Sequence, residues 1–197
     1  MRTNIIVLAA GNSVRFQGIK LFEAIEGRPM YQYVIEKAIQ VKADKIIVVT
    51  QFEEIKNWAE EKNLTVVMNP NSAAGISGSI RLGISADDTA DAYVFMVCDQ
   101  PFITVESING LLKGFYDSEK GMACVKIGQR LGNPCVFSKK YKDDLLALEG
   151  DAGGKKVLCS KLEDVFYYCV ENEWELMDVD SKEDFRMLME GKGQIGY

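Results

Sequence analysis

The chain of 197 residues contains no histidine. This absence excludes Ser-His-Asp and Cys-His catalysis, zinc sites built from imidazole ligands, and proton transfer by histidine. Any chemistry must therefore use carboxylates, cations, backbone amides or a metal ion held by oxygen ligands. Oxygen ligands suit magnesium or manganese.

Cysteine, proline and long apolar runs are also scarce. The five cysteines are scattered without any C-x-x-C pair, which disfavours a structural zinc site and indicates a reduced, cytoplasmic protein. Four prolines and the lack of a low-complexity tract argue against a disordered chain. No apolar run approaches the roughly 20 residues of a membrane helix, and the start "MRTNIIVLAAGN" lacks the apolar segment of a secretory signal. The expectation is a cytoplasmic protein with no membrane partner.

The charge balance narrows the possible partners. The formal net charge of -6 disfavours a general nucleic-acid binder, which needs a basic surface. A hydrophobic content of 47% in a chain of this length is enough for one ordinary domain, which is predicted to span residues 1–197. Local pairs of cations stand out against this acidic background.

Apolar runs and helical periodicities alternate along the chain. Strands are predicted at 4–9, 45–50, 64–68, 92–98, 121–127, 134–138 and 165–170. Helices are predicted at 31–41, 52–62, after the turn within 71–85, from the N-cap Thr104 to 115, at 139–148, at 154–161, and from the capping box Ser181-x-x-Asp184 to 190. This alternation predicts an α/β sandwich with a largely parallel sheet, and the adjacent strands at 121–138 predict an antiparallel part.

The loop after the first strand, "GNSVRFQGIK" (11–20), carries two cations. Backbone amides of a glycine-bearing turn can bind an anion, Arg15 can hold phosphate oxygens with two hydrogen bonds, and Lys20 can act as a point charge. The loop is neither a Walker A sequence nor G-x-G-x-x-G. The alternative is a surface turn with solvated cations.

Two acidic stretches follow predicted strands. Asp99 comes directly after the most apolar strand, at the sheet edge where ligands of open α/β sheets bind, and it is a candidate metal ligand. Asp178 and Asp180 alternate in an extended piece, so only one of them can readily face a site shared with Asp99. The alternatives are a turn before Pro101 and ordinary acidity at a helix start.

Two glycine-rich stretches are further candidates. In "GISGSIRLG" (75–83), Ser77 and Ser79 can approach a nucleotide base or sugar. In "EGDAGGKKVL" (149–158), the glycines around Asp151 can allow a loop to close over a ligand. The alternatives are a helix N-cap and a surface turn.

These stretches, in this order, resemble the nucleotidyltransferase superfamily that activates sugars and pterins with nucleoside triphosphates. The opening "LAAGNSVRFQGIK" matches its L-x-x-G-x-S-x-R-x-x-x-x-K signature. Within that superfamily the chain looks most like the molybdenum cofactor cytidylyltransferase branch, through "NPNSAAGISGSIRLGI", "CDQPFIT", "GNPCVF", "LEGDAGGKKVL" and "DVDSKEDF". The resemblance covers nearly the whole chain.

The resemblance implies a fold, an activity and a set of site residues. The fold is a three-layer α/β/α sandwich with a mostly parallel, mixed sheet, a Rossmann-like nucleotidyltransferase fold. The activity is transfer of CMP from CTP, with Mg²⁺ or Mn²⁺, to the phosphate of molybdopterin cofactor, with release of pyrophosphate. The implied catalytic residues are Arg15, Lys20 and Asp99; the implied nucleotide contacts are Leu8, Ala9, Ala10, Gly11, Ser13, Arg15, Lys20, Ser77, Ser79 and Asp99; the implied metal ligands are Asp99 and Asp180, with Asp178 as the alternative; and the acceptor-side residues are Gln100, Asn133, Asp151 and Lys155.

The nucleotide and the acceptor depend on a few positions. Branches that use GTP usually have two glycines where this chain has Ala10-Gly11, so the resemblance favours CTP. The family usually has Gly-His-Pro where this chain has Gly132-Asn133-Pro134, and often arginine at the position of Lys155. Both departures bear on the identity of the acceptor more than on the transfer of the nucleotide. Alternative functions are a sugar- or alditol-phosphate nucleotidyltransferase and a non-catalytic molybdenum cofactor carrier, and a molybdenum hydroxylase is a candidate recipient of the product.

Overall fold

The computed structural model describes residues 1–13, 16 and 18–191. The strands are β1 Thr3–Ala9, β2 Ala24–Ile25, β3 Arg28–Pro29, β4 Lys45–Thr50, β5 Thr65–Met68, β6 Ala92–Val97, β7 Met122–Ile127, β8 Arg130–Ser138 and β9 Val165–Cys169. The α-helices are α1 Met30–Gln40, α2 Glu53–Glu61, α3 Ile76–Ser85, α4 Val105–Asp117, α5 Lys142–Leu146, α6 Gly154–Ser160 and α7 Lys182–Gly191. Short 3₁₀ turns are η1 Lys20–Phe22, η2 Ser72–Ala74, η3 Lys139–Tyr141, η4 Leu162–Asp164 and η5 Glu173–Leu176.

Seven strands form one sheet in the order β5-β4-β1-β6-β8-β7-β9. β1 pairs in parallel with both β4 and β6, and β4 pairs in parallel with β5. β8 is antiparallel to its neighbours β6 and β7, while β7 and β9 are parallel. The predicted mixed, mostly parallel sheet is therefore confirmed, including its antiparallel part within 121–138.

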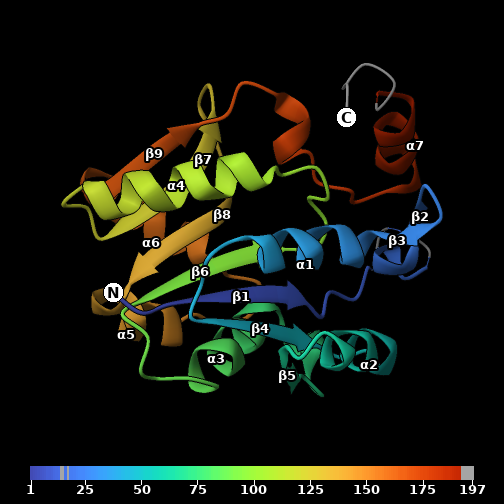
Figure 1. Ribbon diagram of the computed structural model, residues 1–197, viewed down its shortest axis with the longest axis horizontal. Coiled ribbons are helices and arrows are strands. Elements are labelled where there is room, and N and C mark those ends of the chain that lie inside the picture. Colours follow the sequence, from blue (N-terminus) through green and yellow to red (C-terminus); the bar gives the residue numbers. More distant parts are fainter. Residues whose placement is uncertain (14–15, 17, 192–197) are drawn as a thin grey trace.

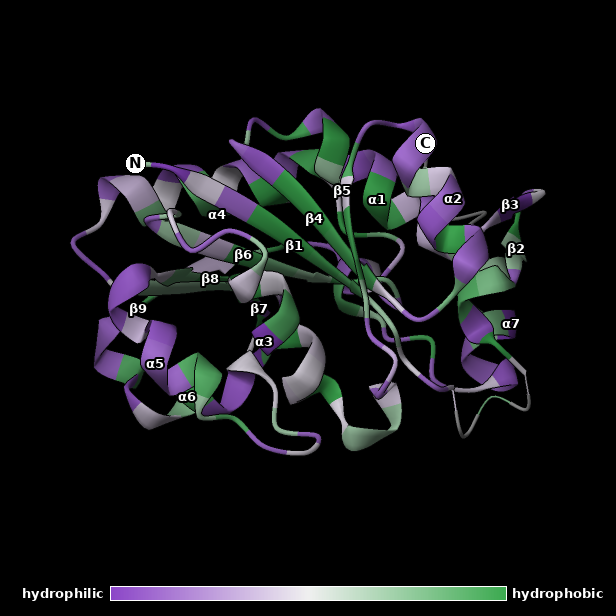
Figure 2. Cartoon of the chain, turned by 90° about the horizontal axis from the view of Figure 1, so that it is seen from below, coloured by the Kyte–Doolittle hydropathy of each residue, from purple (hydrophilic) through white to green (hydrophobic). Residues whose placement is uncertain are grey.

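Both faces of this sheet are covered, which explains the continuous apolar runs. Along β1, Ile5, Val7 and Ala9 belong to one buried cluster, together with residues of α1, α2 and α4. Ile6 and Leu8 belong to the other, with residues of α3, α5 and α6. Figure 1 shows α1 and α4 on one side of the sheet and α3 and α5 on the other. Figure 2 shows the central strands β1 and β4 coloured mostly as hydrophobic, whereas α5 is mostly hydrophilic. The predicted three-layer α/β/α sandwich is confirmed.

Side-chain caps begin two of the helices, as the sequence predicts. The Thr104 hydroxyl accepts a hydrogen bond from Ser107 N at 3.1 Å at the start of α4. At the start of α7, Asp184 N donates to Ser181 Oγ and Ser181 N donates to Asp184 Oδ2. This reciprocal pair is the capping box. Burial raises the pKa of Asp184, but the hydrogen bonds it accepts leave that pKa below its usual value.

The strand order fixes where a ligand can bind. From β1 the chain continues to β4 and β5 on one side, and then returns to β6 on the other side of β1. In open α/β sheets such a switch point opens a crevice at the carboxyl ends of the two strands. The loops after β1 and β6 carry the predicted phosphate loop and Asp99. None of the described helices combines the length and apolar character that crossing a membrane requires.

Candidate active site

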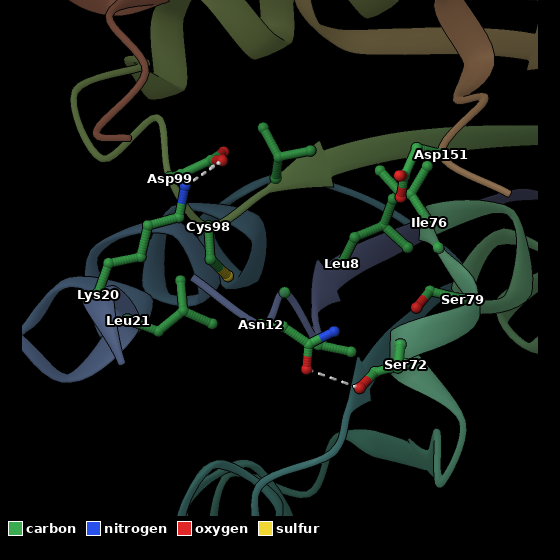
Figure 3. A pocket seen from close by; sticks show the side chains of 15 residues that line it. Leu8, Asn12, Lys20, Leu21, Ser72, Ile76, Ser79, Cys98, Asp99 and Asp151 are labelled. Carbon is green, nitrogen blue, oxygen red and sulfur yellow. Dashed lines mark hydrogen bonds and ion pairs between the residues drawn. The ribbon is translucent and has the colours of Figure 1, made fainter. Parts of the chain in front are cut away.

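A pocket of about 310 Å³ opens at the switch point between β1 and β6. One wall comes from the end of β1, with Leu8, Ala10 and Gly11, and another from the end of β6, with Asp99. Lys20 closes one side, and the start of α3 closes the opposite side (Figure 3). The pocket therefore lies at the edge of the sheet where the sequence predicts a ligand site.

The loop after β1 is held in shape by its own hydrogen bonds. Ser13 has a left-handed backbone conformation, with φ of 51°. Its hydroxyl accepts a hydrogen bond from Lys20 N at 3.1 Å, and its carbonyl accepts one from Phe16 N at 2.9 Å. Phe16 is buried and packs edge-on against Phe185 of α7. The hydroxyl of Ser13 thus positions the backbone of Lys20. Arg15 lies outside the described residues.

Lys20 joins the two predicted metal ligands. Its side chain is 10% exposed, and Nζ lies 2.9 Å from Asp99 Oδ2 and 3.0 Å from Asp180 Oδ1. Burial lowers the pKa of Lys20, but Asp99 and Asp180 more than offset that effect and leave the pKa above its usual value. The ammonium is therefore a permanent charge between two carboxylates, one from the middle of the chain and one from near its C-terminus.

Asp178 points away from this pair, as the alternation of the extended piece predicts. Its Oδ1 accepts a hydrogen bond from Gln100 Nε2 at 2.7 Å, and its Oδ2 lies 2.9 Å from the guanidinium of Arg130. Burial and the nearby charge of Asp99 raise the pKa of Asp178. Of the two candidates for the second ligand, Asp180 is the one that shares Lys20 with Asp99.

A polar network lines the side of the pocket near α3. Asn12 Oδ1 accepts hydrogen bonds from Gln51 Nε2 at 2.9 Å and from Ser72 Oγ at 3.1 Å, the latter drawn in Figure 3. Gln51 Nε2 also donates to the carbonyl of Ala10 at 2.8 Å. The predicted contact Ser79 lines the pocket and accepts a hydrogen bond from the Asn69 amide at 2.9 Å. Hydroxyls and amides therefore face the space where a base or sugar is predicted.

Two predicted nucleotide residues lie deeper than the pocket wall. Ala9 is buried in the sheet, and its carbonyl accepts a hydrogen bond from the Thr50 hydroxyl at 2.9 Å. Ser77 is completely buried, and its hydroxyl has no hydrogen-bond partner in the part of the chain that the structure describes. Contacts of these residues with a ligand stay predictions.

The start of α3 packs against the glycine-rich loop 149–153. Gly75 has a φ of 99°, and a Cβ there would lie 2.2 Å from the backbone of Gly150. Ser77 N donates to the Gly150 carbonyl at 3.2 Å. This close approach brings Asp151 into the lining of the pocket.

Gly75→Ala is therefore expected to lower the melting temperature by about 5 °C or more and to weaken nucleotide binding, because the methyl group meets backbone that cannot move aside. Gly78→Ala, within the helix α3 that Gly75 precedes, is the matched control. Its Cβ would lie 3.9 Å from Asn69 Nδ2, and alanine is the better helix former. Thermal melts and nucleotide titrations of both variants check this expectation. Equal behaviour of the two variants would contradict it.

The remaining acceptor-side candidates lie apart from this pocket. Asn133 and Lys155 line a separate depression of about 30 Å³ beside Leu131, Gly132 and Cys135. In the β7–β8 pairing, Cys124 faces Cys135 and Val125 faces Gly132, so two residues of β8 bulge out at this point. One of these two residues is Asn133. Whether this depression contacts an acceptor stays a prediction.

The carboxylates at the pocket fit a magnesium or manganese ion by their chemistry. Asp99 and Asp180 supply hard oxygen ligands and are 28% and 40% exposed. Over residues 1–13, 16 and 18–191, no group of three or more cysteine or acidic residues is placed to hold a metal ion alone. Magnesium commonly binds through one or two carboxylates and completes its coordination with water and substrate phosphates. Two carboxylates beside the loop after β1 satisfy that pattern.

Sequence reasoning missed two parts of this site. The Asn12–Gln51–Ser72 network escaped because each residue occurs in a different loop, although Asn12 lies within the signature. Arg130 escaped because it is separated from Asp178 by 48 residues. No spacing or motif connects a lone arginine at a hairpin to that carboxylate.

Several curated proteins are similar to this chain. The chain is 31% identical over 121 residues to a "Probable molybdenum cofactor guanylyltransferase" of Thermococcus sibiricus, a match covering 61% of this chain and 59% of that protein. It therefore spans less than two thirds of that relative. It is 24% identical over 195 residues to the "Purine catabolism protein PucB" of Bacillus subtilis, covering 93% of this chain and 94% of that protein.

Solved structures and a family model complete the comparison. Rv0371c of Mycobacterium tuberculosis H37Rv, solved as a complex with manganese, superimposes with a TM-score of 0.80 over 96% of this chain and 99% of that chain, at 22% identity. At that identity the match shows the fold alone. The model of the "MobA-like NTP transferase domain" matches residues 5–165. The signature loop, the switch-point pocket and Asp99 lie within the matched residues, Asp180 follows them, and the chain belongs to the MobA-like NTP transferase domain family.

Proposed function

We propose that this protein is a cytidylyltransferase that transfers CMP from CTP to the phosphate of molybdenum cofactor and releases pyrophosphate. The observation that carries the proposal is that Lys20 and Asp99 line the switch-point pocket, and that Lys20 also binds Asp180. Membership of an NTP transferase family supports the reaction class. The relative named as a molybdenum cofactor guanylyltransferase supports the class of acceptor.

The reaction needs no histidine. An oxygen of the acceptor phosphate, already ionised, attacks the α-phosphorus of CTP, and the bond from that phosphorus to the bridging oxygen breaks. Pyrophosphate leaves with the electron pair. The protein's part is alignment and charge stabilisation. Lys20 neutralises charge on the triphosphate and on the leaving pyrophosphate, and backbone amides of the loop at Gly11 face the phosphates. A divalent ion held by Asp99 and Asp180 supplies further charge neutralisation when bound.

Gly11 supports a close approach of phosphate to the loop. Apart from Gly11 and its two chain neighbours, no atom of the described residues lies within 4 Å of the place where a Cβ of Gly11 would be. The protein itself therefore leaves room at this position, and a phosphate of the ligand can occupy the same space. Leu8 and Ala10 line the pocket beside it.

The choice of CTP rests on Ala10, where GTP-using branches usually have glycine. The Thermococcus relative carries a guanylyltransferase name, so GTP is the main competing nucleotide. Ser79, with its hydroxyl fixed by Asn69, and Asn12 with its two hydrogen bonds are the groups proposed to contact base and ribose.

A non-catalytic cofactor carrier is the second candidate. It is motivated by Asn133 and Lys155, which depart from the family pattern and lie together in one depression. A carrier would have no need for Lys20 between two carboxylates at the end of β6, which favours the enzyme. A molybdenum hydroxylase is the proposed recipient of the product in either case.

The test is a nucleotide and acceptor panel with pyrophosphate release as the readout. CTP with molybdenum cofactor and Mg²⁺ or Mn²⁺ is expected to give the fastest turnover, with GTP slower. Sugar phosphates and alditol phosphates replace the cofactor in parallel reactions. Faster turnover with one of them would overturn the acceptor. Tight cofactor binding with no pyrophosphate from any nucleotide would favour the carrier.

A further inference from the structure

The segment 172–180, which carries Asp180, is tied to the loop after β6 by hydrogen bonds. Glu175 is buried, and its Oε2 accepts from the Thr104 amide at 3.0 Å and from the Thr104 hydroxyl at 2.9 Å. Val179 N donates to the Asp99 carbonyl at 2.9 Å. These ties place the end of the segment beside the end of β6, although the two are far apart in the sequence.

Each carboxylate oxygen of Asp178 accepts a hydrogen bond that also holds this segment. Gln100 is 4% exposed and donates its Nε2 to Oδ1 at 2.7 Å. Arg130, at the start of β8, donates to Oδ2 at 2.9 Å and also to the carbonyl of Leu176. Arg130 therefore holds both the backbone and a side chain of the segment.

These contacts also reduce charge repulsion among three carboxylates. Asp99, Asp178 and Asp180 bring three carboxylates to one place, and like charges at short range repel. Lys20 offsets the first and third, and Arg130 with Gln100 offsets the second. Arg130 thereby adds to the ties from Val179 and Glu175 that hold the segment carrying Asp180 beside the end of β6.

We propose that Arg130 and Gln100 are positioning residues, which hold Asp178 and so keep Asp180 at the distance from Asp99 that a shared divalent ion requires. The proposal rests on the proposed function in one respect, the use of Asp99 and Asp180 as metal ligands. It gives Gln100 a role different from the acceptor contact that the resemblance implies. Asp178 then acts through its neighbours and does not bind the ion.

Manganese binding to the full-length protein is the direct test, measured by calorimetry or by the electron paramagnetic resonance signal of free Mn²⁺, with and without CTP. Arg130→Met keeps the apolar stem and removes the charge. It is expected to weaken Mn²⁺ binding about tenfold, the usual scale for groups that orient metal ligands. Arg130→Lys should restore most of the affinity.

The chain offers a matched control in Arg28. Its guanidinium lies 2.8 Å from Glu36, and its side chain is 50% exposed, as is that of Arg130. Arg28→Met should leave Mn²⁺ affinity unchanged. Gln100→Leu, of similar volume, is a second test that does not depend on the folding of Arg130→Met, and it should weaken binding in the same direction.

Kinetics separate positioning from a general loss of structure. In Arg130→Met the Mg²⁺ concentration for half-maximal rate should rise about tenfold, while kcat at saturating Mg²⁺ stays near the wild-type value. A fall in kcat that excess Mg²⁺ does not restore, or Mn²⁺ affinity equal to wild type, would overturn the proposal. Absence of Mn²⁺ binding in the wild type would overturn it too. A wild type that binds Mn²⁺ more tightly than Arg130→Met but transfers no nucleotide would defeat the proposed function and leave the positioning role standing.

Discussion

Asp99→Asn is expected to lower kcat/KM for CTP about a thousandfold, which corresponds to about 4 kcal/mol of transition-state stabilisation. Asparagine has nearly the same shape and can still accept the hydrogen bond from Lys20. The backbone bond from Val179 N to the Asp99 carbonyl does not involve the side chain. The variant therefore loses charge and metal affinity while the site keeps its geometry.

The measurement is pyrophosphate release at several Mg²⁺ concentrations, together with Mn²⁺ binding and a thermal melt. Asp144→Asn is the control, because Asp144 is 46% exposed and pairs with Lys161 on the surface. Both variants should melt close to the wild type, and only Asp99→Asn should lose activity and bind Mn²⁺ weakly. Retention of activity within about tenfold would remove Asp99 from the metal site, since a direct ligand contributes more than its supporting neighbours.

Most of the fold was predictable because its central strands are buried on both faces. The run 45–50 coincides with β4, and β1 and β6 differ from the predicted ranges by one residue. β8 begins at Arg130, four residues before the predicted strand, because its first residues pair with β7 but are only partly buried. The two-residue strands β2 and β3 are too short to show any alternation. The extent of one domain over 1–197 stays a prediction.

The helix predicted at 139–148 differs in kind. The structure has a 3₁₀ turn, Lys139–Tyr141, followed by the short helix Lys142–Leu146. Periodicity does not separate these cases, because both present apolar residues every three or four positions. The turn follows directly on the last residue of β8, Ser138, and Tyr141 within it is buried, and neither fact is visible in the sequence.

Of the contacts in the site, one is predictable from the sequence and another is not. The approach of Lys20 to Asp99 follows from topology, because the loops after two neighbouring parallel strands meet at one edge. The approach of Asp180, which is 160 residues from Lys20, does not follow from any local pattern. It depends on the ties of the segment 172–180 to Thr104, Asp99 and Arg130. The family resemblance indicated Asp180, but it did not indicate what holds it.

Lys20→Met is expected to change Mn²⁺ affinity in the opposite direction to Asp99→Asn. It should lower kcat/KM for CTP by a factor of about a hundred to a thousand, because the charge that stabilises the leaving pyrophosphate is lost. Mn²⁺ binding without nucleotide should become tighter than in the wild type. The reason is that Lys20 holds two carboxylates at 2.9 and 3.0 Å, and a metal ion must compete with that ammonium.

The ion pairs of Lys20 also predict how stability and activity depend on pH. Because the folded pKa of Lys20 lies above 10.5, the stabilisation by its ion pairs is complete below that pH and is lost only as the pH rises further. Assays between about pH 6 and pH 9 should therefore show no titration of Lys20.

Lys45→Met is the control for Lys20→Met, because Lys45 also neutralises a buried carboxylate. That carboxylate is Asp87, at 2.9 Å, and Lys45 is at the end of β4 away from the pocket. It should destabilise the protein without changing Mn²⁺ affinity. If Lys20→Met instead weakens Mn²⁺ binding, the lysine is needed to assemble the carboxylates, and the proposed competition between ammonium and metal is wrong.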